Sequence, residues 1–503
     1  MKRLLAILLL VCLFAGCTAQ PDAYIPTGGG FDGDAVPSTP TQTSTNTELR
    51  LPYDKNGSFH PYTATDLNNR SLLSLVYQGL FAMNDNYAPT PILCKNYQVS
   101  ADLREWTFYL ENATFSDGQP VTAQDVVTSL NTANAQGFYA GRFRQVKGIW
   151  AANDGSVHIT LNTPMSNLPL LLDVPIIKAS QKNAAIPLGT GPYILEDTAD
   201  GKQLRRQVAW WCNAALPVSA QIIPLDHGTT QRELWDLYKF SGLSMVCTDA
   251  YVDFRGDYEL WESENGVFLY MTCNMKSKVF SDPAVRSALT FAIDRDMLVK
   301  KFYRGFAHSA TLPASPSFPS YSTTLAEKYA YQPEKFALVV TESNKTGSEI
   351  VLLVNRDDPL RLTTAQAIAE MLTAAGLVVT IPEVSGTDYF NKLKWGEFDL
   401  VLGQTKLSPN MDLTAFFGDQ GSLNYGNIGD VAFHSMSLES LADSGNYQTL
   451  HKMVMEDGRM CPILVRSDAV YGRRGCFPGL APSRDTIFYY TLGKTMEDAK
   501  ITE

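Results

Sequence analysis

The chain has 503 residues, and its 45% hydrophobic content is sufficient for large folded cores. Its 52 acidic residues outnumber its 41 basic ones, so the formal net charge is −11. Nucleic-acid binders need clustered lysine and arginine against phosphates, and the only basic run lies at the extreme N-terminus, so these numbers argue against that class.

The N-terminus has the pattern of a secretory signal peptide. A basic start at positions 2 and 3 precedes an apolar run from Leu4 to Phe14, shorter than the roughly 20 residues of a membrane-spanning helix. The run ends in Ala15-Gly16-Cys17, which resembles a bacterial lipobox, although Phe14 stands where leucine is usual. We expect a lipoprotein signal peptide over 1–16 and a lipid on Cys17, with an ordinary secretory peptide as the alternative. Residues 17–47 are rich in Thr, Pro, Gly and Ser, which predicts a disordered tether.

Helices and strands are predicted to alternate in the rest of the chain. The pattern predicts a strand near 48–54, a helix over 69–81, and strands over 105–110 and 155–161. Residues 280–305 are predicted as one helix, capped by Asp282, opened by Pro283 and ended by Gly305. Residues 363–384 predict a second helix, a stop at Gly376 and a strand. This alternation favours an α/β fold.

Two carboxylates in "FSDGQPVTAQDVVTSL" (115–130) raise the question of acid–base catalysis. Asp117 belongs to a tight-turn sequence in which Gly118 supplies positive φ. Thr122 suits a helix N-cap, and Asp125 follows three residues later, where its carboxylate can reach the backbone of the cap. Both therefore have structural roles, which we favour over catalysis.

Enzyme and metal signatures are absent from the sequence. It contains no GxSxG, HExxH or GxxxxGK[ST] motif, and its six histidines are scattered. We therefore expect no catalytic activity, no cofactor and no bound metal. Six cysteines lie beyond the signal region, at 94, 212, 247, 273, 461 and 476. The pairs Cys461–Cys476 and Cys212–Cys247 are suggested by sequence proximity alone, and buried free thiols are the alternative.

Several segments together resemble the extracellular solute-binding proteins of family 5, the oligopeptide, dipeptide and nickel class. They stand in family order between about 48 and 470: "FHPYTATD" (59–66), residues 75–130, "PLGTGPYILE" (187–196), residues 269–298 and "GEFDLVLGQ" (396–404). The resemblance implies a periplasmic-binding-protein-like type II clamshell with two lobes and an inserted domain. Lobe I would comprise 48–75, 186–275 and 469–503, domain II 76–185, and lobe III 276–468. The hinge would lie near 274–278 and 466–470.

The resemblance also implies a partner and a mechanism. The chain would be a monomeric receptor that closes over a peptide or other small solute and delivers it to the transmembrane permease of an ABC importer, which a cytoplasmic ATPase drives. It would lie outside the cytoplasm, on the outer face of the membrane, or in the periplasm if the envelope is Gram-negative. A nickel or metallophore receptor and a sensory lipoprotein are the alternatives.

Candidate ligand residues follow from the same resemblance. In peptide-binding members, an aspartate that follows a G-W segment binds the free α-amino group of the peptide. In this sequence Gln404 stands at the position of the tryptophan. Without a gap in the alignment, Leu407 stands at the position of the aspartate, next to Lys406. A shifted alignment would recruit Asp412 instead. We therefore expect that a standard peptide with a free N-terminus is not the preferred ligand. The other candidates are Trp210 and Trp211, with core packing as the alternative, Arg356, with a surface charge as the alternative, and Tyr270 and Asn274 near the first crossover.

Overall fold

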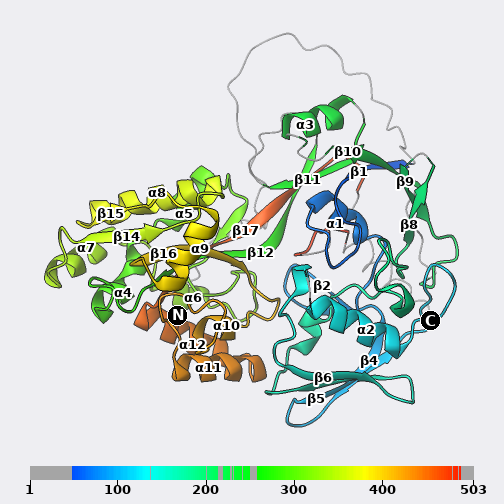
Figure 1. Cartoon of the computed structure of the whole chain (residues 1–503), viewed down its shortest axis with the longest axis horizontal. Helices are drawn as coiled ribbons and strands as arrows, with labels where there is room; N and C mark the ends of the chain where they lie inside the picture. Colours follow the sequence, from blue (N-terminus) through cyan, green and yellow to red (C-terminus); the bar gives the residue numbers. More distant parts are fainter. Residues whose placement is uncertain are drawn as a thin grey trace, which may run out of the picture. The chain divides into compact units, whose positions relative to one another are not determined.

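The computed structural model describes residues 48–135, 137–199, 201–212, 219–226, 229, 231–240, 242–249, 258–477, 480–484 and 487–488 (Figure 1). The expected signal peptide, Cys17 and the tether over 17–47 lie outside the described residues. Residues 46–503 form one compact unit. Within the described residues, no helix is long and apolar enough to cross a membrane.

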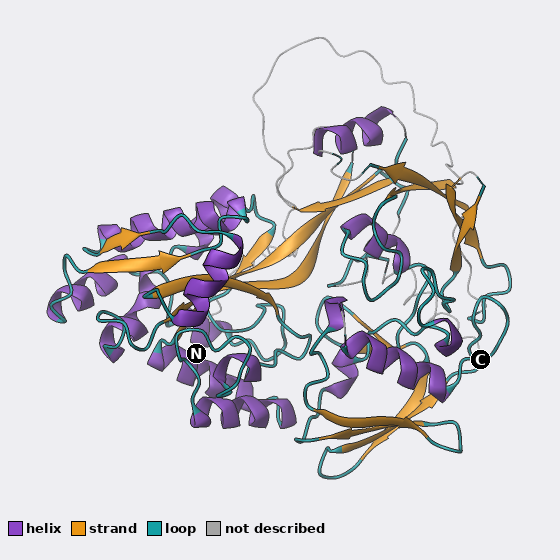
Figure 2. Ribbon diagram, in the orientation of Figure 1, coloured by secondary structure: helices purple, strands orange, loops and turns teal. Residues whose placement is uncertain are grey.

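A seven-stranded mixed sheet is the largest element of the fold (Figures 1 and 2). Its strand order is β11-β17-β12-β16-β14-β15, with β13 also paired to β17. The pairs β14–β15 and β14–β16 are parallel and the others antiparallel. The strands are β11 (Met245–Asp249), β12 (Glu259–Cys273), β13 (Ala307–Ser309), β14 (Glu349–Leu353), β15 (Val378–Thr380), β16 (Leu400–Lys406) and β17 (Met460–Gly472).

The two longest strands, β12 and β17, are shared between separate hydrophobic cores. Leu269 of β12 and Ile463 of β17 pack in a core with helices of the segment 279–377. At the other end of β17, Tyr471 packs with Val246 of β11 in a different core. Between these ends the β12–β17 register shifts at Glu264–Phe268, and such a bulge bends a strand locally. A continuous strand pair, with this shift and a second one between Leu269 and Tyr270, therefore joins two packed bodies.

The C-terminal segment packs against this bulge. Gly266, at φ 70°, lies inside it, and a Cβ on Gly266 would stand 2.2 Å from Cζ of Arg484. The Ser263 hydroxyl also donates to the Ser483 carbonyl at 3.1 Å. Glycine is therefore favoured at this position, because its positive φ strains any other residue and a side chain would have to displace the Arg484 guanidinium.

The single helix expected over 280–305 is wrong. The structure has α4 (Pro283–Ala288), the 3-10 turn η4 (Leu289–Ala292) and α5 (Arg295–Phe302). Ile293 is extended, and Asp294 caps α5 by accepting from the Met297 N–H at 2.9 Å. The guanidinium of Arg295 is buried and donates to the carbonyls of Thr290 and Pro462, at 3.1 and 2.9 Å. The chain breaks here because this arginine satisfies carbonyls that a continuous helix would occupy.

The N-terminal part of the fold is built on two parallel strands, β1 (Glu48–Asp54) and β10 (Ser219–Leu225). The expected helix over 69–81 is shorter than predicted: α1 spans Leu67–Leu73. The chain leaves the helix because the carbonyl of Leu75 accepts from Tyr193 and that of Val76 accepts from Gly191. Val76 and Tyr77 are buried as expected, but in the turn and loop that follow α1.

Residues 76–185 contain a four-stranded antiparallel sheet with order β4-β5-β7-β6. Val157, Ile159 and Leu161 alternate inward along β7, as predicted. The helix α2 (Ala123–Asn134) begins with the predicted capping box, because the Thr122 hydroxyl accepts from the Asp125 N–H and Asp125 accepts from the Thr122 N–H. These strands are β4 (Cys94–Val99), β5 (Glu105–Leu110), β6 (Val146–Ala151) and β7 (Val157–Leu161).

The remaining elements cover these sheets. The strands are β2 (Phe81–Met83), β3 (Pro89–Pro91), β8 (Tyr193–Thr198) and β9 (Gly201–Arg206). The helices are α3 (Gln231–Phe240), α6 (Thr323–Glu327), α7 (Pro333–Glu342), α8 (Pro359–Ala374), α9 (Gly386–Trp395), α10 (Thr414–Phe417), α11 (Val431–Ala442) and α12 (Asn446–Asp457). The predicted helix over 363–374 lies in α8, the predicted stop at Gly376 has φ 100°, and the strand follows as β15.

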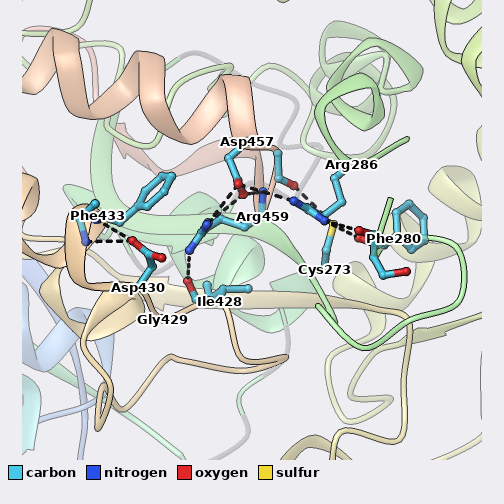
Figure 3. Close-up of polar contacts among 12 residues, drawn as sticks. Cys273, Phe280, Arg286, Ile428, Gly429, Asp430, Phe433, Asp457 and Arg459 are labelled. Atoms are coloured by element: carbon cyan, nitrogen blue, oxygen red, sulfur yellow. Dashed lines mark hydrogen bonds and ion pairs between the residues drawn. The ribbon is translucent and has the colours of Figure 1, made fainter. Parts of the chain in front are cut away.

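A buried polar network holds the turn between α12 and β17 (Figure 3). Asp457 accepts from Nε and Nη2 of Arg459 at 2.8 and 3.1 Å and lies 3.5 Å from Nη2 of Arg286. Burial alone would raise the pKa of Asp457, but the hydrogen bond from Arg459 and the two positive charges outweigh it and hold the pKa below its usual value. One carboxylate thus serves two arginines that are each less than 8% exposed.

Both suggested disulfides are wrong, and the alternative of free thiols holds for the cysteines concerned. Cys247, Cys461 and Cys476 carry free thiols, as does Cys273. Cys247 instead accepts from the Ser71 hydroxyl at 3.4 Å. Cys461 lies within β17, where its sulfur accepts from Arg295 at 3.5 Å. Proximity in sequence misled because Cys247 and Cys461 contact residues that are far away along the chain.

Candidate ligand-binding site

A cavity of about 490 Å³ lies at the bulge between β12 and β17. Its walls come from segments far apart in the sequence, which the fold brings together. Lys406 ends β16, Arg466 and Asp468 belong to β17, and Asn265 and Val267 belong to β12. The other lining residues are Asp54, Asp66, Leu67, Asn68, Arg70, Leu225, Asp226, Thr229, Leu234, Cys247 and Thr248.

The position of the cavity follows from strand direction. The parallel strands β1 and β10 end at Asp54 and Leu225, and both residues line the cavity. The strand β16, parallel to β14, reaches the cavity with its last residue, Lys406. Carboxyl ends of parallel strands leave side chains and loops free to face a ligand, which is why α/β proteins commonly bind there.

The wall formed by the sheet carries charged side chains of both signs, Lys406, Arg466 and Asp468. Asp468 accepts from Nδ2 of Asn265 at 2.9 Å. Burial raises the pKa of Asp468, although this hydrogen bond and the charges of Arg70, Lys406 and Arg466 oppose the rise. Three cations are therefore close enough to act on one buried carboxylate.

On the opposite wall, the carboxylates already have partners. Asp66 caps α1 by accepting from the N–H groups of Asn68 and Asn69 at 2.9 and 3.0 Å. Asp54 accepts from the Asn56 N–H at 2.9 Å, and Asp226 pairs with Lys55. Each of these acids is therefore held in place by a neighbouring group of the protein.

Asn68 provides an unused acceptor in this cavity. Its side chain is only 9% exposed, and its Oδ1 has no hydrogen-bond partner among the described residues. A buried amide oxygen without a partner costs free energy, roughly 1–3 kcal/mol. A ligand donor in the cavity would remove that cost.

A second cavity of about 540 Å³ is a weaker candidate. It is lined mainly by residues 55–63 and 182–186, with Lys202. Its Lys55 and Lys202 are paired with Asp226 and Asp197. It also takes no residue from β12, β16 or β17, so it lies away from the strands that join the two bodies.

Of the candidates named from the sequence, Lys406 lines the 490 Å³ cavity and the others do not. Leu407 is 3% exposed in a hydrophobic core. Asp412 accepts from the Thr414 N–H at 2.7 Å and lies 3.9 Å from Nε of Arg144. Gln404 is half-buried opposite Leu269.

The other candidates have partners within the protein. The indole N–H groups of Trp210 and Trp211 donate to the Thr190 carbonyl at 2.8 and 3.0 Å. Tyr270 is 1% exposed and packs edge-on against Phe416. Asn274 donates to the carbonyls of Gly396 and Phe398 at 2.9 and 2.8 Å. Arg356 pairs with Glu383 at 2.9 Å beside a separate cavity of about 270 Å³.

Sequence reasoning missed most of the cavity. Arg70 and Asn68 follow directly after the quoted segment "FHPYTATD", and Arg466 and Asp468 fall in the expected hinge segment 466–470. Arg466 and Asp468 could have been proposed as ligand contacts from the sequence, because they are polar residues in a segment expected to form a hinge next to the ligand. Within the described residues, no group of three or more His, Cys, Asp or Glu side chains is placed to hold a metal ion.

Comparison with known proteins identifies the family of this chain. Residues 88–424 match the family described as bacterial extracellular solute-binding proteins, family 5 middle. The chain is 28% identical over 294 residues to the glutathione-binding protein GsiB of Escherichia coli O6:K15:H31, covering 55% of this chain and 57% of that relative. The chain thus spans little more than half the length of that curated relative.

Solved structures show the same fold. The putative peptide-binding protein AppA of Clostridium difficile superposes with a TM-score of 0.73 at 17% identity, over 89% of this chain and 99% of that one. NikA of Brucella suis, solved with Fe(III)-EDTA, gives a TM-score of 0.71 at 18% identity, over 89% and 99%. The α/β fold expected from the sequence is therefore confirmed.

Proposed function

The chain belongs to the bacterial extracellular solute-binding proteins of family 5, and on that premise we propose that it is the receptor subunit of an ABC importer. Solute-binding proteins of this family are receptors rather than enzymes. In the proposed role, the protein captures a small solute outside the cytoplasm and presents it to a membrane permease whose ATPase supplies the energy.

The observation that carries this proposal is the cavity at the β12–β17 bulge. It draws on both bodies that these strands join, so a ligand there contacts both at once. Such a ligand favours the conformation in which the bodies are close, because its contacts to both exist only there. Lobe I (48–75, 186–275 and 469–503) and lobe III (276–468) would be the moving parts, with domain II (76–185) inserted.

We further propose a peptide or peptide-like solute as the ligand. The GsiB relative is a glutathione-binding protein, and the cavity of about 490 Å³ has the volume of a small-molecule site. A standard free-amine mode is not favoured, because Leu407 is buried in a core and Asp412 already has partners in the Thr414 N–H and Arg144. The lipid on Cys17 would keep the receptor at the outer face of the membrane.

Native mass spectrometry of residues 18–503, purified without the signal and the lipid cysteine, tests the proposal. A co-purifying mass of a few hundred daltons that mild unfolding releases would support it and identify the solute. If no mass co-purifies, binding of di- and tripeptides is measured by calorimetry. A chain that binds neither these peptides nor glutathione would contradict the peptide-receptor role.

A further inference from the structure

Domain II (76–185) contacts lobe III directly, in addition to the connection that β12 and β17 make between the two bodies. Phe81 shares a hydrophobic core with Leu51 of β1, so domain II is packed onto the N-terminal body. Tyr87 packs instead in a core with Phe318 of lobe III, and the two rings meet edge to face at 5.6 Å between centroids. Domain II therefore belongs to one body by its core and touches the other body along a second surface.

Glu264 of β12 accepts a hydrogen bond from each side of this contact. The Tyr87 hydroxyl donates to Oε1 of Glu264, and the Ser315 hydroxyl of lobe III donates to Oε2 at 2.7 Å. Tyr87 is 5% exposed and Ser315 is 1% exposed, so water competes little for these bonds. One side chain thus ties domain II to lobe III.

A second set of hydrogen bonds joins the same two parts through groups that lie on neither β12 nor β17. The N–H and the hydroxyl of Ser166 donate to the Leu441 carbonyl at 2.9 and 3.2 Å. Nδ2 of Asn167 donates to the hydroxyl of Tyr447, which is fully buried, at 3.2 Å. A rotation about β12 and β17 separates these groups, so opening breaks the bonds. We call the residues on the two sides of this contact the seam: Tyr87, Ser166 and Asn167 of domain II, and Ser315, Leu441 and Tyr447 of lobe III.

The seam lies outside the ligand cavity. The described residues that line the 490 Å³ cavity include none of the six seam residues. A solute in that cavity therefore leaves the seam bonds unchanged, and the seam bonds form without the solute. Contacts that exist in only one of two arrangements favour that arrangement, whether or not a solute is bound.

We propose that the seam is a clasp that holds the receptor closed without a solute, so that the solute binds to a form that already exists. This inference rests on the proposed receptor function. The observed affinity is the affinity of the closed form multiplied by the fraction of closed molecules. A weaker clasp therefore lowers the affinity for every solute by the same factor, so the seam sets affinity and leaves specificity to the cavity.

Small-angle X-ray scattering tests the clasp on protein without a solute. The chain is unfolded and refolded to remove any bound solute, and native mass spectrometry checks the solute-free mass. The wild type is compared with the double variant Tyr87→Phe/Asn167→Ala, which removes the donors to Glu264 and Tyr447. Tyr303→Phe is the matched control, because the buried Tyr303 hydroxyl lies 3.2 Å from the Thr364 hydroxyl within lobe III. Circular dichroism checks that each variant is folded.

The expected result is a larger radius of gyration in the double variant than in the wild type, and an unchanged radius in Tyr303→Phe. The ratio of closed to open molecules should fall about 10-fold, as for the loss of two hydrogen bonds. An equal radius of gyration in the folded double variant and the wild type would overturn the clasp, and so would an equal expansion in Tyr303→Phe. The receptor function is decided separately, by the solute-binding measurements described above.

Discussion

His451 should lower the stability of this protein as the pH falls, and the substitution His451→Leu should remove this contribution. The residue lies on α12, is fully buried, and neither ring nitrogen has a hydrogen-bond partner among the described residues. Burial lowers the pKa of His451 to about 3, because the charged ring would lose its hydration without gaining a partner. The ring therefore stays neutral in the folded protein at mildly acidic pH.

The magnitude follows from linkage between protonation and folding. An unfolded chain protonates this histidine near pH 6.5, whereas the folded chain does not do so until about pH 3, so the unfolded state binds the extra proton over this window. Stability is therefore lost as the pH falls below 6.5. Between pH 7 and pH 5 this one residue should cost about 2 kcal/mol, at a limiting slope of about 1.4 kcal/mol per pH unit.

The assay is urea unfolding of the wild type and of His451→Leu at pH 7 and pH 5, followed by tryptophan fluorescence. Other titrating groups contribute to both proteins, so the difference between their pH dependences isolates His451. Leucine should reduce the loss of stability on acidification by about 2 kcal/mol. It should also leave the protein as stable or more stable at pH 7, because two unpaired polar atoms leave the core. His434→Leu, at a half-buried position on α11, is the matched control. Equal pH dependence in the wild type and His451→Leu would refute this reasoning.

Three further substitutions test structural roles described above. Thr122→Ala removes the N-cap of α2 and should lower the free energy of unfolding by about 1 kcal/mol, measured by urea titration; an unchanged value would deny the cap its role. Asp457→Ala leaves Arg286 and Arg459 buried without their shared carboxylate and should cost about 3–5 kcal/mol, and a loss below 1 kcal/mol would contradict the network. Gly266→Ala places a methyl group against Arg484 and should lower the melting temperature. The decrease should be several degrees larger than for the control Gly155→Ala, because Gly155 has a similar positive φ but no atom within 4 Å of the added Cβ. Equal decreases in the two variants would show that the segment around Arg484 does not hold the bulge.

Local patterns predicted local structure well. The alternation of Val157, Ile159 and Leu161 and the capping pair Thr122 and Asp125 depend on neighbours in sequence, and the structure confirms both. The break at Ile293 was invisible because it depends on Arg295 reaching a carbonyl of β17, far along the chain. The spacing of apolar residues can predict a helix, but it does not indicate which carbonyl groups will accept hydrogen bonds from a buried arginine.

The cavity was harder to predict for the same reason. Lys406 drew notice through its place beside a family motif, whereas Arg466, Asp468 and Asn68 are common surface residue types with no distinctive spacing. Arg466 and Asp468 reach the cavity through the pairing of β12 with β16 and β17, which joins residues about 130 to 210 positions apart. The aromatic candidates Trp210 and Trp211 illustrate the converse, because their indole groups are engaged inside the fold.

The buried thiols carry a consequence for how such a protein is made. Burial raises the pKa of Cys247 to about 12 and raises the pKa values of Cys273 and Cys461. Oxidants and disulfide exchange act on exposed thiolates, so the folded chain withholds these sulfurs from an oxidising compartment. The unfolded chain has no such protection, and every slow step between export and folding exposes it to wrong disulfides. If the chain is exported as proposed, its folding must therefore outpace oxidation, and replacing these cysteines with alanine should reduce the fraction that forms wrong disulfides.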